Sequence, residues 1–461
     1  MAKRVLINIF NTDGIIDFAK SLTEKAGFSV TATEKARKFL AENGIQTEEF
    51  DWNNADFDVY VINFDTFDKY QNKDMELQTI LNQIDNIGFS LLEKAVKNFE
   101  KSIILTNPNQ YKSVLSEIIS GDISSKENLL KEAIMLNCQI HSSLLNVLNN
   151  ENQYLSLTAN KATDLLHGEN PYQKASLYAH KTVSYDIISE DALSYNDLTD
   201  INLATAIAAE FYDVSAAILT KLGLTCAAAF GSDAESAFNK AIDCDPISVF
   251  GSAAAFTRPI DEKFAKTLST MKLKIISAPD FSTQATEILQ SVGTKLIKIN
   301  TPLKDFKKYL NNEIKVTPFG ILSQQANTMD LLKDSFKLVT KKKPTTEIIE
   351  DMVFGWKVAK YTRSKSALVV KDLKTTGISQ GQTNLIEAID IALDKACEKS
   401  KDAILVTDGE INTIEAIQDA AQGRIAGIIC AGCGSKKAEI TALADKYEIT
   451  MITTGLKQYK Q

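Results

Sequence analysis

The sequence predicts an α/β fold, with an N-terminal doubly wound parallel-sheet domain followed by a second α/β region. Short apolar runs typical of buried strands alternate with amphipathic segments typical of helices. The 461 residues are enough for two or three domains. Gly168, Asn170 and Pro171 lie within four positions and form a polar turn between Asn-rich and Ala-rich sequence. Turns of this kind between globular regions are places where sites form.

The N-terminal region supplies the parallel sheet. Its predicted strands are residues 4–9, 28–31, 59–63 and 102–107, and helical patterns lie between them. Residues 108–160 are helical and polar, which is typical of a connector. In a parallel sheet, ligands bind beyond the carboxyl ends of the strands. The predicted site loops are therefore Phe10–Gly14, Thr31–Lys35 and Asn63–Phe67.

Composition narrows the function classes. A net charge of −8 argues against non-specific nucleic-acid binding. We expect no membrane association, because no apolar run is long enough to span a bilayer and the start of the chain is typical of a strand. Six scattered cysteines favour reduced thiols and a cytoplasmic location. Cys430 and Cys433 form a C-A-G-C pair, but with no second pair and only three histidines we predict no metal site.

The polar turn also carries a family resemblance. It reads G-E-N-P-Y-Q and resembles the G-E-N-P-H-Q turn of the bifunctional AICAR transformylase/IMP cyclohydrolase family of purine biosynthesis. The resemblance continues through L-S-Y-N-D-L, D-C-D-P-I-S-V-F-G, S-A-P-D-F-S, G-I-S-Q-G-Q and the closing T-T-G-L-K-Q-Y-K-Q. It therefore covers nearly the whole chain.

The resemblance implies an architecture and an activity. It implies a methylglyoxal-synthase-like domain over 1–120, a helical connector over 121–160, and two cytidine-deaminase-like lobes over 161–340 and 341–461. The implied assembly is a homodimer. The implied activity is formyl transfer from 10-formyltetrahydrofolate to AICAR, followed by ring closure to IMP.

The cyclohydrolase loops differ from those of the family. F-N-T-D-G and A-T-E-K-A stand where the family has S-D-K-T-G and S-T-G-G-T, so Asp13 and Glu34 would repel a phosphate. The family segment G-R-V-K-T-L-H-P is absent. By resemblance, Asn63 and Asp85 contact substrate and Lys97 transfers a proton. An isolated Asp and Lys on helices are also typical of a solvated face. The sequence predicts that cyclisation is lost.

The transformylase positions are also altered. By resemblance, Lys221 handles the proton as the amine attacks the formyl group, but the partner histidine is Leu222, which cannot accept one. His167 is a candidate relocated base, or a structural hydrogen-bonded histidine. The remaining matches are implied to contact the nucleotide (Asn170, Asp245) and the folate (Gln382, Asp408).

Two functions stay open. One is an AICAR transformylase with a rearranged site. The other is a catalytically inactive paralogue that binds a purine nucleotide such as AICAR or IMP and acts as a regulatory or partner-stabilising dimer. A related reaction on another substrate is a third possibility.

Overall fold

The computed structural model describes residues 3–65, 76–148, 153–179, 182–310, 312–330 and 335–461. The chain divides into two compact units, Met1–Asn160 and Lys161–Gln461. Both units are α/β, with a parallel sheet in the first and a large mixed sheet in the second, so the predicted fold class is confirmed. Among the helices so described, none is long and apolar enough to cross a membrane.

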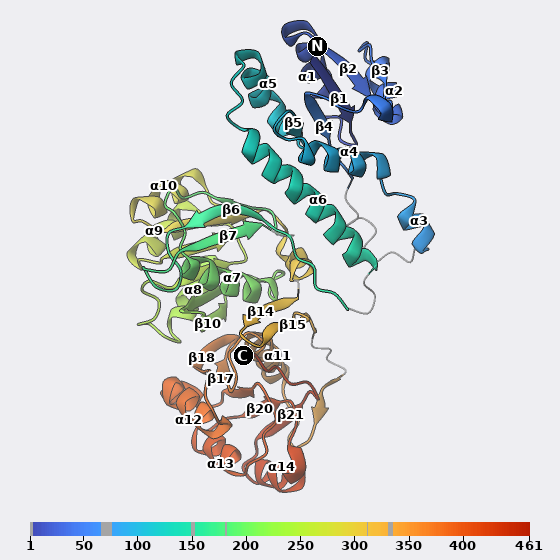
Figure 1. Ribbon diagram of the computed structural model, residues 1–461. Coiled ribbons are helices and arrows are strands. Elements are labelled where there is room, and N and C mark those ends of the chain that lie inside the picture. Colours follow the sequence, from blue (N-terminus) through green and yellow to red (C-terminus); the bar gives the residue numbers. More distant parts are fainter. Residues whose placement is uncertain (1–2, 66–75, 149–152, 180–181, 311, 331–334) are drawn as a thin grey trace. The chain divides into compact units, whose positions relative to one another are not determined.

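The first unit contains a five-stranded parallel sheet in the order β3-β2-β1-β4-β5. The strands are β1 (Lys3–Asn8), β2 (Phe28–Ala32), β3 (Glu48–Glu49), β4 (Val59–Ile62) and β5 (Ile103–Leu105) (Figure 1). Four of them, β1, β2, β4 and β5, lie where the sequence predicted strands. Parallel pairing brings their carboxyl ends to one edge of the sheet.

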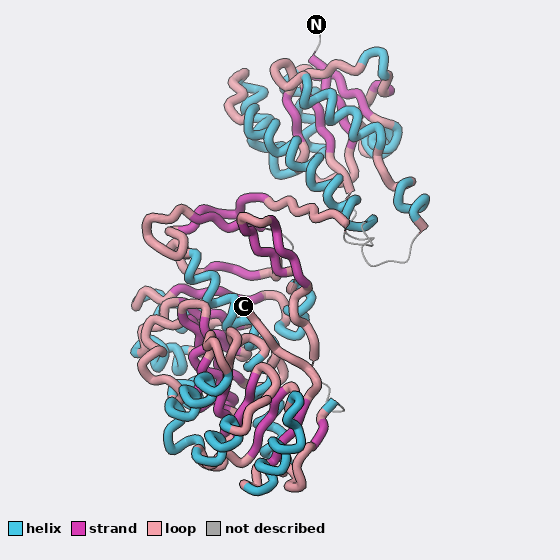
Figure 2. The backbone as a smooth tube through the Cα atoms, turned by 60° about the horizontal axis from the view of Figure 1, so that its bottom comes forward, coloured by secondary structure: helices cyan, strands magenta, loops and turns pink. Residues whose placement is uncertain are grey.

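Helices cover both faces of this sheet (Figure 2). Successive strand residues point to opposite faces, so Ile7 lies in one core with α1 and α5 while Leu6 lies in another with α4 and α6. The helices are α1 (Ile15–Ala26), α2 (Glu34–Glu42), α3 (Leu77–Leu81), α4 (Asn86–Lys97), α5 (Tyr111–Ser120) and α6 (Lys126–Leu148). The segment predicted as a connector therefore contains α6, which contacts α4 and β5.

The second unit contains one twelve-stranded sheet shared by two lobes with the same order of elements. The first lobe runs α7 (Tyr195–Ala209), β9 (Ala216–Lys221), β10 (Leu224–Phe230), α8 (Ala234–Ile242), β11 (Ala253–Phe256), α9 (Glu262–Thr270), β12 (Ile275–Ala278), α10 (Thr283–Ser291), β13 (Lys295–Ile299). The second runs α11 (Thr346–Ala359), β17 (Ala367–Lys371), β18 (Lys374–Ser379), α12 (Leu385–Ala396), β19 (Ile404–Thr407), α13 (Glu415–Gln422), β20 (Gly427–Cys430), α14 (Lys437–Lys446), β21 (Thr450–Thr453). The lobes join where β10 pairs with β18.

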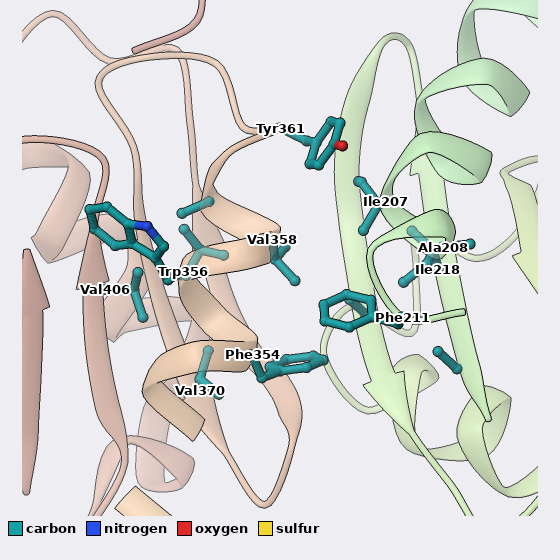
Figure 3. Close-up of a cluster of buried hydrophobic side chains, with 14 of the residues drawn as sticks. Ile207, Ala208, Phe211, Ile218, Phe354, Trp356, Val358, Tyr361, Val370 and Val406 are labelled. Carbon is teal, nitrogen blue, oxygen red and sulfur yellow. The ribbon is translucent and has the colours of Figure 1, made fainter. Parts of the chain in front are cut away.

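The two lobes also share a hydrophobic core built on α7 and α11. Figure 3 shows α11 between the lobes, with Trp356 directed toward Val406 of its own lobe and Phe354 toward Phe211 of the other. The Phe211 and Phe354 rings stack with centroids 5.3 Å apart. The opposite face of each lobe has its own core, under α8–α10 and under α12–α14. The second unit is therefore one packed body.

Shorter elements surround this body. Two separate two-stranded sheets are formed by β6 (Asn160–Leu165) with β7 (Ala175–Ala179) and by β14 (Glu313–Thr317) with β15 (Gly320–Gln324). The edge strands of the large sheet are β8 (Tyr185–Ile187) and β16 (Lys337–Leu338). Short 3-10 helices lie at η1 (Trp52–Asn54), η3 (Pro108–Gln110), η4 (Leu303–Tyr309), η6 (Cys397–Ser400) and η7 (Gly434–Lys436).

Candidate functional site

A cavity of about 640 Å³ lies beyond the carboxyl ends of β1, β2 and β4 in the first unit. Residues from all three predicted site loops line it, among them Phe10, Thr33, Lys35 and Asp65. Thr66 and Phe67 of the third loop lie outside the described residues. The parallel sheet therefore positions a candidate site where such sheets place their ligands.

Two of the predicted substrate residues, Asp85 and Asn63, form hydrogen bonds within the chain, and only Asp85 lines this cavity. Asp85 is the N-cap of α4, where its Oδ1 accepts from the Gly88 N–H at 2.8 Å and its Oδ2 from Asn8 Nδ2 at 2.7 Å. Thr33 in turn donates to Asn8 Oδ1 at 2.6 Å. Asn63 Oδ1 accepts from the backbone N–H groups of Phe10 and Asn11, each at 2.7 Å. Asp85 thus ties the start of α4 to the end of β1, and Asn63 ties the end of β4 to the loop after β1.

The structure does not bring Lys97 to this cavity. Asp85 caps the N-terminal end of α4 and Lys97 is its last residue. The helix has 12 residues, a length of about 18 Å. Lys97 is exposed and does not line the cavity. Asp85 and Lys97 both match family positions in the sequence. In the structure they lie at opposite ends of α4.

The charges around the cavity disfavour a phosphate. Four carboxylates line it, on Glu34, Glu42, Asp65 and Asp85, against the two ammonium groups of Lys35 and Lys38. Lys38 pairs with Glu34 at 3.2 Å, and the Lys35 Nζ lies 4.6 Å from the centroid of the Phe10 ring. The excess of negative charge would repel an anionic group.

A second cavity, of about 190 Å³, lies at the seam between the two lobes. Lys221, Thr225 and Asp245 line it from the first lobe, and Gln380 and Lys395 from the second. Lys221 and Asp245 are site residues that the sequence predicted. No local pattern marked Thr225, Gln380 and Lys395 as site residues, although Gln380 stands inside the G-I-S-Q-G-Q motif.

Lys221 is held at the mouth of a tight hairpin. It ends β9, and Leu222 and Gly223 turn the chain with φ values of 56° and 72°. The Gly223 N–H donates to Asp200 Oδ1 at 2.6 Å, which ties the turn to α7. The Lys221 Nζ donates to the Phe250 carbonyl oxygen at 2.7 Å. Leu222 also lines the cavity, with a side chain that is 77% exposed and has no polar atom.

Asp245 supplies a carboxylate to the cavity. Its two oxygens accept hydrogen bonds from Ser248, from the backbone N–H at 2.9 Å and from the hydroxyl at 2.6 Å. Burial alone would raise the pKa of Asp245, but the hydrogen bonds from Ser248 outweigh it, so the pKa lies below its ordinary value. Burial also raises the pKa of the neighbouring thiols, to about 12 for Cys226 and about 11 for Cys244. The site therefore contains an ionised carboxylate beside neutral thiols.

His167 and Asn170 flank the turn between β6 and β7. Asn170 Nδ2 donates to Gln173 Oε1 at 2.9 Å, and the Gly168 N–H donates to the Gln173 carbonyl oxygen at 2.7 Å. The His167 Nδ1 lies 2.8 Å from the Gly168 carbonyl oxygen, so this nitrogen carries a proton in that contact. Neither residue lines the Lys221 cavity.

Asp408 and Gln382 lie in the second lobe. Asp408, which follows β19, is fully buried. Burial raises the pKa of Asp408, opposed by Ser364 and by the charge of Lys365. The Lys365 Nζ lies 3.8 Å from the centroid of the Tyr459 ring, and its backbone exchanges hydrogen bonds with that of Gln382 at 2.9 and 3.1 Å. The Asp408 carboxyl group is therefore closed off from solvent.

The two cysteines of the C-A-G-C pair are buried at the end of β20, where the Cys430 Sγ lies 3.3 Å from the Gly432 carbonyl oxygen. Within the described ranges, no group of three or more His, Cys, Asp or Glu side chains is arranged to hold a metal ion.

Comparison with known proteins gives one family. A family model for the AICARFT/IMPCHase bienzyme matches residues 95–395. The bifunctional purine biosynthesis protein PurH of Clostridium botulinum (strain Okra / Type B1) is 30% identical over 513 residues, covering 100% of both chains. PurH of Oceanobacillus iheyensis is 29% identical over 514 residues, also covering 100% of both. A solved structure, "Crystal structure of ForH", covers 33% of this chain and 100% of its own at 16% identity and a TM-score of 0.29.

Proposed function

The chain belongs to the AICARFT/IMPCHase bienzyme family, and from this premise we propose that its second unit transfers a formyl group from 10-formyltetrahydrofolate to AICAR. The observation that carries the proposal is the seam cavity, in which an ammonium group and a carboxylate lie together. Formyl transfer needs a cation for the developing oxyanion and an acceptor for the amine proton.

The proposed roles follow from the charges. The amine nitrogen of AICAR attacks the formyl carbon, the bond from that carbon to the folate N10 breaks, and N10 takes up a proton. Lys221 stabilises the oxyanion, since its Nζ uses one N–H on Phe250 and keeps two. Asp245 accepts the amine proton, because its lowered pKa keeps it ionised. A weak carboxylate base makes this step slow compared with one served by histidine.

The other predicted residues keep proposed roles. His167 and Asn170 are proposed to bind the nucleotide through the turn between β6 and β7, with His167 also a candidate base. Gln382 is proposed to contact the folate. Asp408 would act by positioning the C-terminal tail, since its carbonyl oxygen accepts from the Gln458 N–H at 2.8 Å. A cytoplasmic location also remains a prediction.

A homodimer is part of the proposal. The β14–β15 hairpin exposes apolar side chains, with Val316 at 78%, Leu322 at 59% and Phe319 at the turn at 101%. Exposed apolar surface of this kind marks a protein interface. Such an arm is suited to packing against a second copy of the chain.

The alternative is a catalytically inactive dimer that binds a purine nucleotide. One observation favours it: Leu222 occupies the position of the family's histidine and lines the seam cavity without a group that could accept a proton. An assay of AICAR formylation by the purified protein separates the two functions. Formylation that falls at least a hundredfold in Lys221→Ala supports the enzyme. No formylation, with AICAR still bound in calorimetry, supports the inactive dimer.

The duplicated fold offers a matched control. Lys371 ends β17 as Lys221 ends β9, and its Nζ also donates to a carbonyl oxygen, that of Lys401, at 2.7 Å. It does not line the seam cavity. Lys371→Ala should keep formylation at the wild-type rate. An equal loss in both variants would indicate a general structural effect and count against the role of Lys221.

A further inference from the structure

Gln380 reaches across the seam between the lobes with a fixed orientation. It follows β18 of the second lobe, and its Nε2 donates to the Thr225 carbonyl oxygen of β10 at 2.8 Å. A carbonyl oxygen can only accept, so the amide nitrogen must face it. The Gln380 Oε1 therefore faces the other way. That oxygen is buried and has no hydrogen-bond partner among the described residues.

Thr225, which also lines this cavity, has a second unpaired group. The residue is 2% exposed, and its Oγ1 has no hydrogen-bond partner in the described parts of the chain. Buried polar atoms in native proteins are nearly always paired. Two unpaired atoms on residues that line one cavity therefore point to a ligand that supplies their partners.

The chemistry of the ligand follows from the groups available. The cavity offers acceptors in the Gln380 Oε1 and the Asp245 carboxylate, and donors in the Thr225 hydroxyl and the Lys221 and Lys395 ammonium groups. A primary carboxamide presents an N–H and a carbonyl oxygen in one plane, and so matches this set. The volume of about 190 Å³ is below the range of about 300–1,000 Å³ for drug-sized ligands. It suits one small ring with its substituent, and not a whole nucleotide.

We infer that Gln380 determines specificity by accepting a hydrogen bond from the N–H of a heteroaromatic carboxamide. The carbonyl oxygen of that carboxamide accepts hydrogen bonds from the Lys221 ammonium and the Thr225 hydroxyl. The inference deepens the proposed function, on which it rests for the choice of a carboxamide-bearing purine precursor. A carboxylate in place of the carboxamide would set an anion against the Gln380 Oε1 and Asp245. The site therefore selects amide over acid.

The test uses two fragments, imidazole-4-carboxamide and imidazole-4-carboxylate, with saturation-transfer NMR on the full chain. The wild type should prefer the carboxamide. Gln380→Leu should lower that preference by about fivefold to tenfold, the effect of one hydrogen bond. Thr225→Val should weaken carboxamide binding, and Thr225→Ser should restore it. Gln418→Leu, at an exposed position of α13, is the matched control and should change nothing.

The outcomes are distinguishable from those of the formylation assay. If Gln380→Leu lowers the melting temperature but leaves the carboxamide preference unchanged, Gln380 is only structural and the inference is wrong. No carboxamide binding by the wild type also overturns it. Carboxamide binding that depends on Gln380, without formyl transfer, would support the inference and remove the proposed reaction.

Discussion

Glu210 and Lys360 form a buried ion pair of 2.9 Å between the two lobes of the second unit. Glu210 is the C-cap of α7 and Lys360 is the C-cap of α11, so equivalent positions of the duplicated fold carry opposite charges. The Glu210 carboxylate also pairs with Lys307 at 2.8 Å and accepts from the Tyr361 hydroxyl at 2.8 Å. Burial lowers the pKa of Lys360, and the charge of Glu210 opposes this.

Removing one partner of this pair should destabilise the second unit. Glu210→Gln leaves Lys360 buried without its counter-charge, and we expect a loss of about 3–5 kcal/mol. The double variant Glu210→Leu/Lys360→Met should lose less free energy of unfolding than Glu210→Gln, because it leaves no unpaired buried charge. Trp356 is buried in the shared core and the only other tryptophan is Trp52. Its fluorescence in a Trp52→Phe background, followed in urea, reports on this unit alone.

The surface pair between Arg424 and Glu398 is the control. Its side chains are 52% and 89% exposed, so Glu398→Gln should cost under about 1 kcal/mol. Equal losses in Glu398→Gln and Glu210→Gln would contradict the importance given to burial.

Asp197 should contribute to stability at neutral pH. Burial raises its pKa, but the ion pairs with Lys274 at 2.7 Å and Lys295 at 2.8 Å outweigh this and lower the pKa from 3.8 to about 2. The contribution is present above pH 3.8 and is lost as the pH falls toward 2. Asp197→Asn should therefore cost about 2 kcal/mol at pH 7. Urea unfolding at pH 7 and pH 3 tests this.

The control is the exposed pair of Asp280 with Lys298, at 2.7 Å. Asp280→Asn should have a small effect at either pH. A loss in Asp197→Asn that stays the same from pH 7 to pH 3 would mean that the capping box with Ser194, and not the charge, is responsible.

Asp408 should have the opposite pH dependence. Burial raises its pKa above 3.8, so the folded state binds its proton more tightly than the unfolded one. Stability then falls as the pH rises from 3.8 through the folded-state pKa. Asp408→Asn should raise the melting temperature of the second unit at pH 7, and the gain should shrink as the pH approaches 3.8. The control Asp191→Asn, at an exposed position, should leave the melting temperature unchanged. A lower melting temperature in Asp408→Asn at pH 7 would show that the charge is needed.

The β14–β15 hairpin should support dimerisation. Val316→Ser/Phe319→Ser removes apolar surface, so we expect at least a tenfold higher dissociation constant in sedimentation velocity. Tyr447→Ser changes an aromatic side chain that is 42% exposed on another part of the second unit. This control should leave the dissociation constant of the dimer unchanged. A wild-type chain that sediments as a monomer would refute the dimer.

The first unit should not close the purine ring. Its cavity has an excess of carboxylates and lacks Lys97, so the chain supplied with formylated AICAR should produce IMP no faster than buffer. A bienzyme of the family that closes the ring serves as the positive control. IMP formation that disappears in Asp85→Ala would contradict this expectation.

The sequence by itself determined the succession of strands and helices, because buried strands and amphipathic helices leave local periodic patterns. It also carried the motifs of the family, among them the turn with Asn170 and the loop with Asp245. The strand over Val59–Ile62 was predictable because four consecutive apolar residues are buried on both faces of a parallel sheet.

The tertiary structure alone decided which side chains meet. It placed Lys97 at the far end of α4 from Asp85, because a helix separates residues that a motif counts together. It joined Gln380 to Thr225 across 155 positions of sequence through the pairing of β18 with β10. It also buried Asp408. Contacts of this kind depend on how distant elements pack, and local sequence patterns contain no information on that packing.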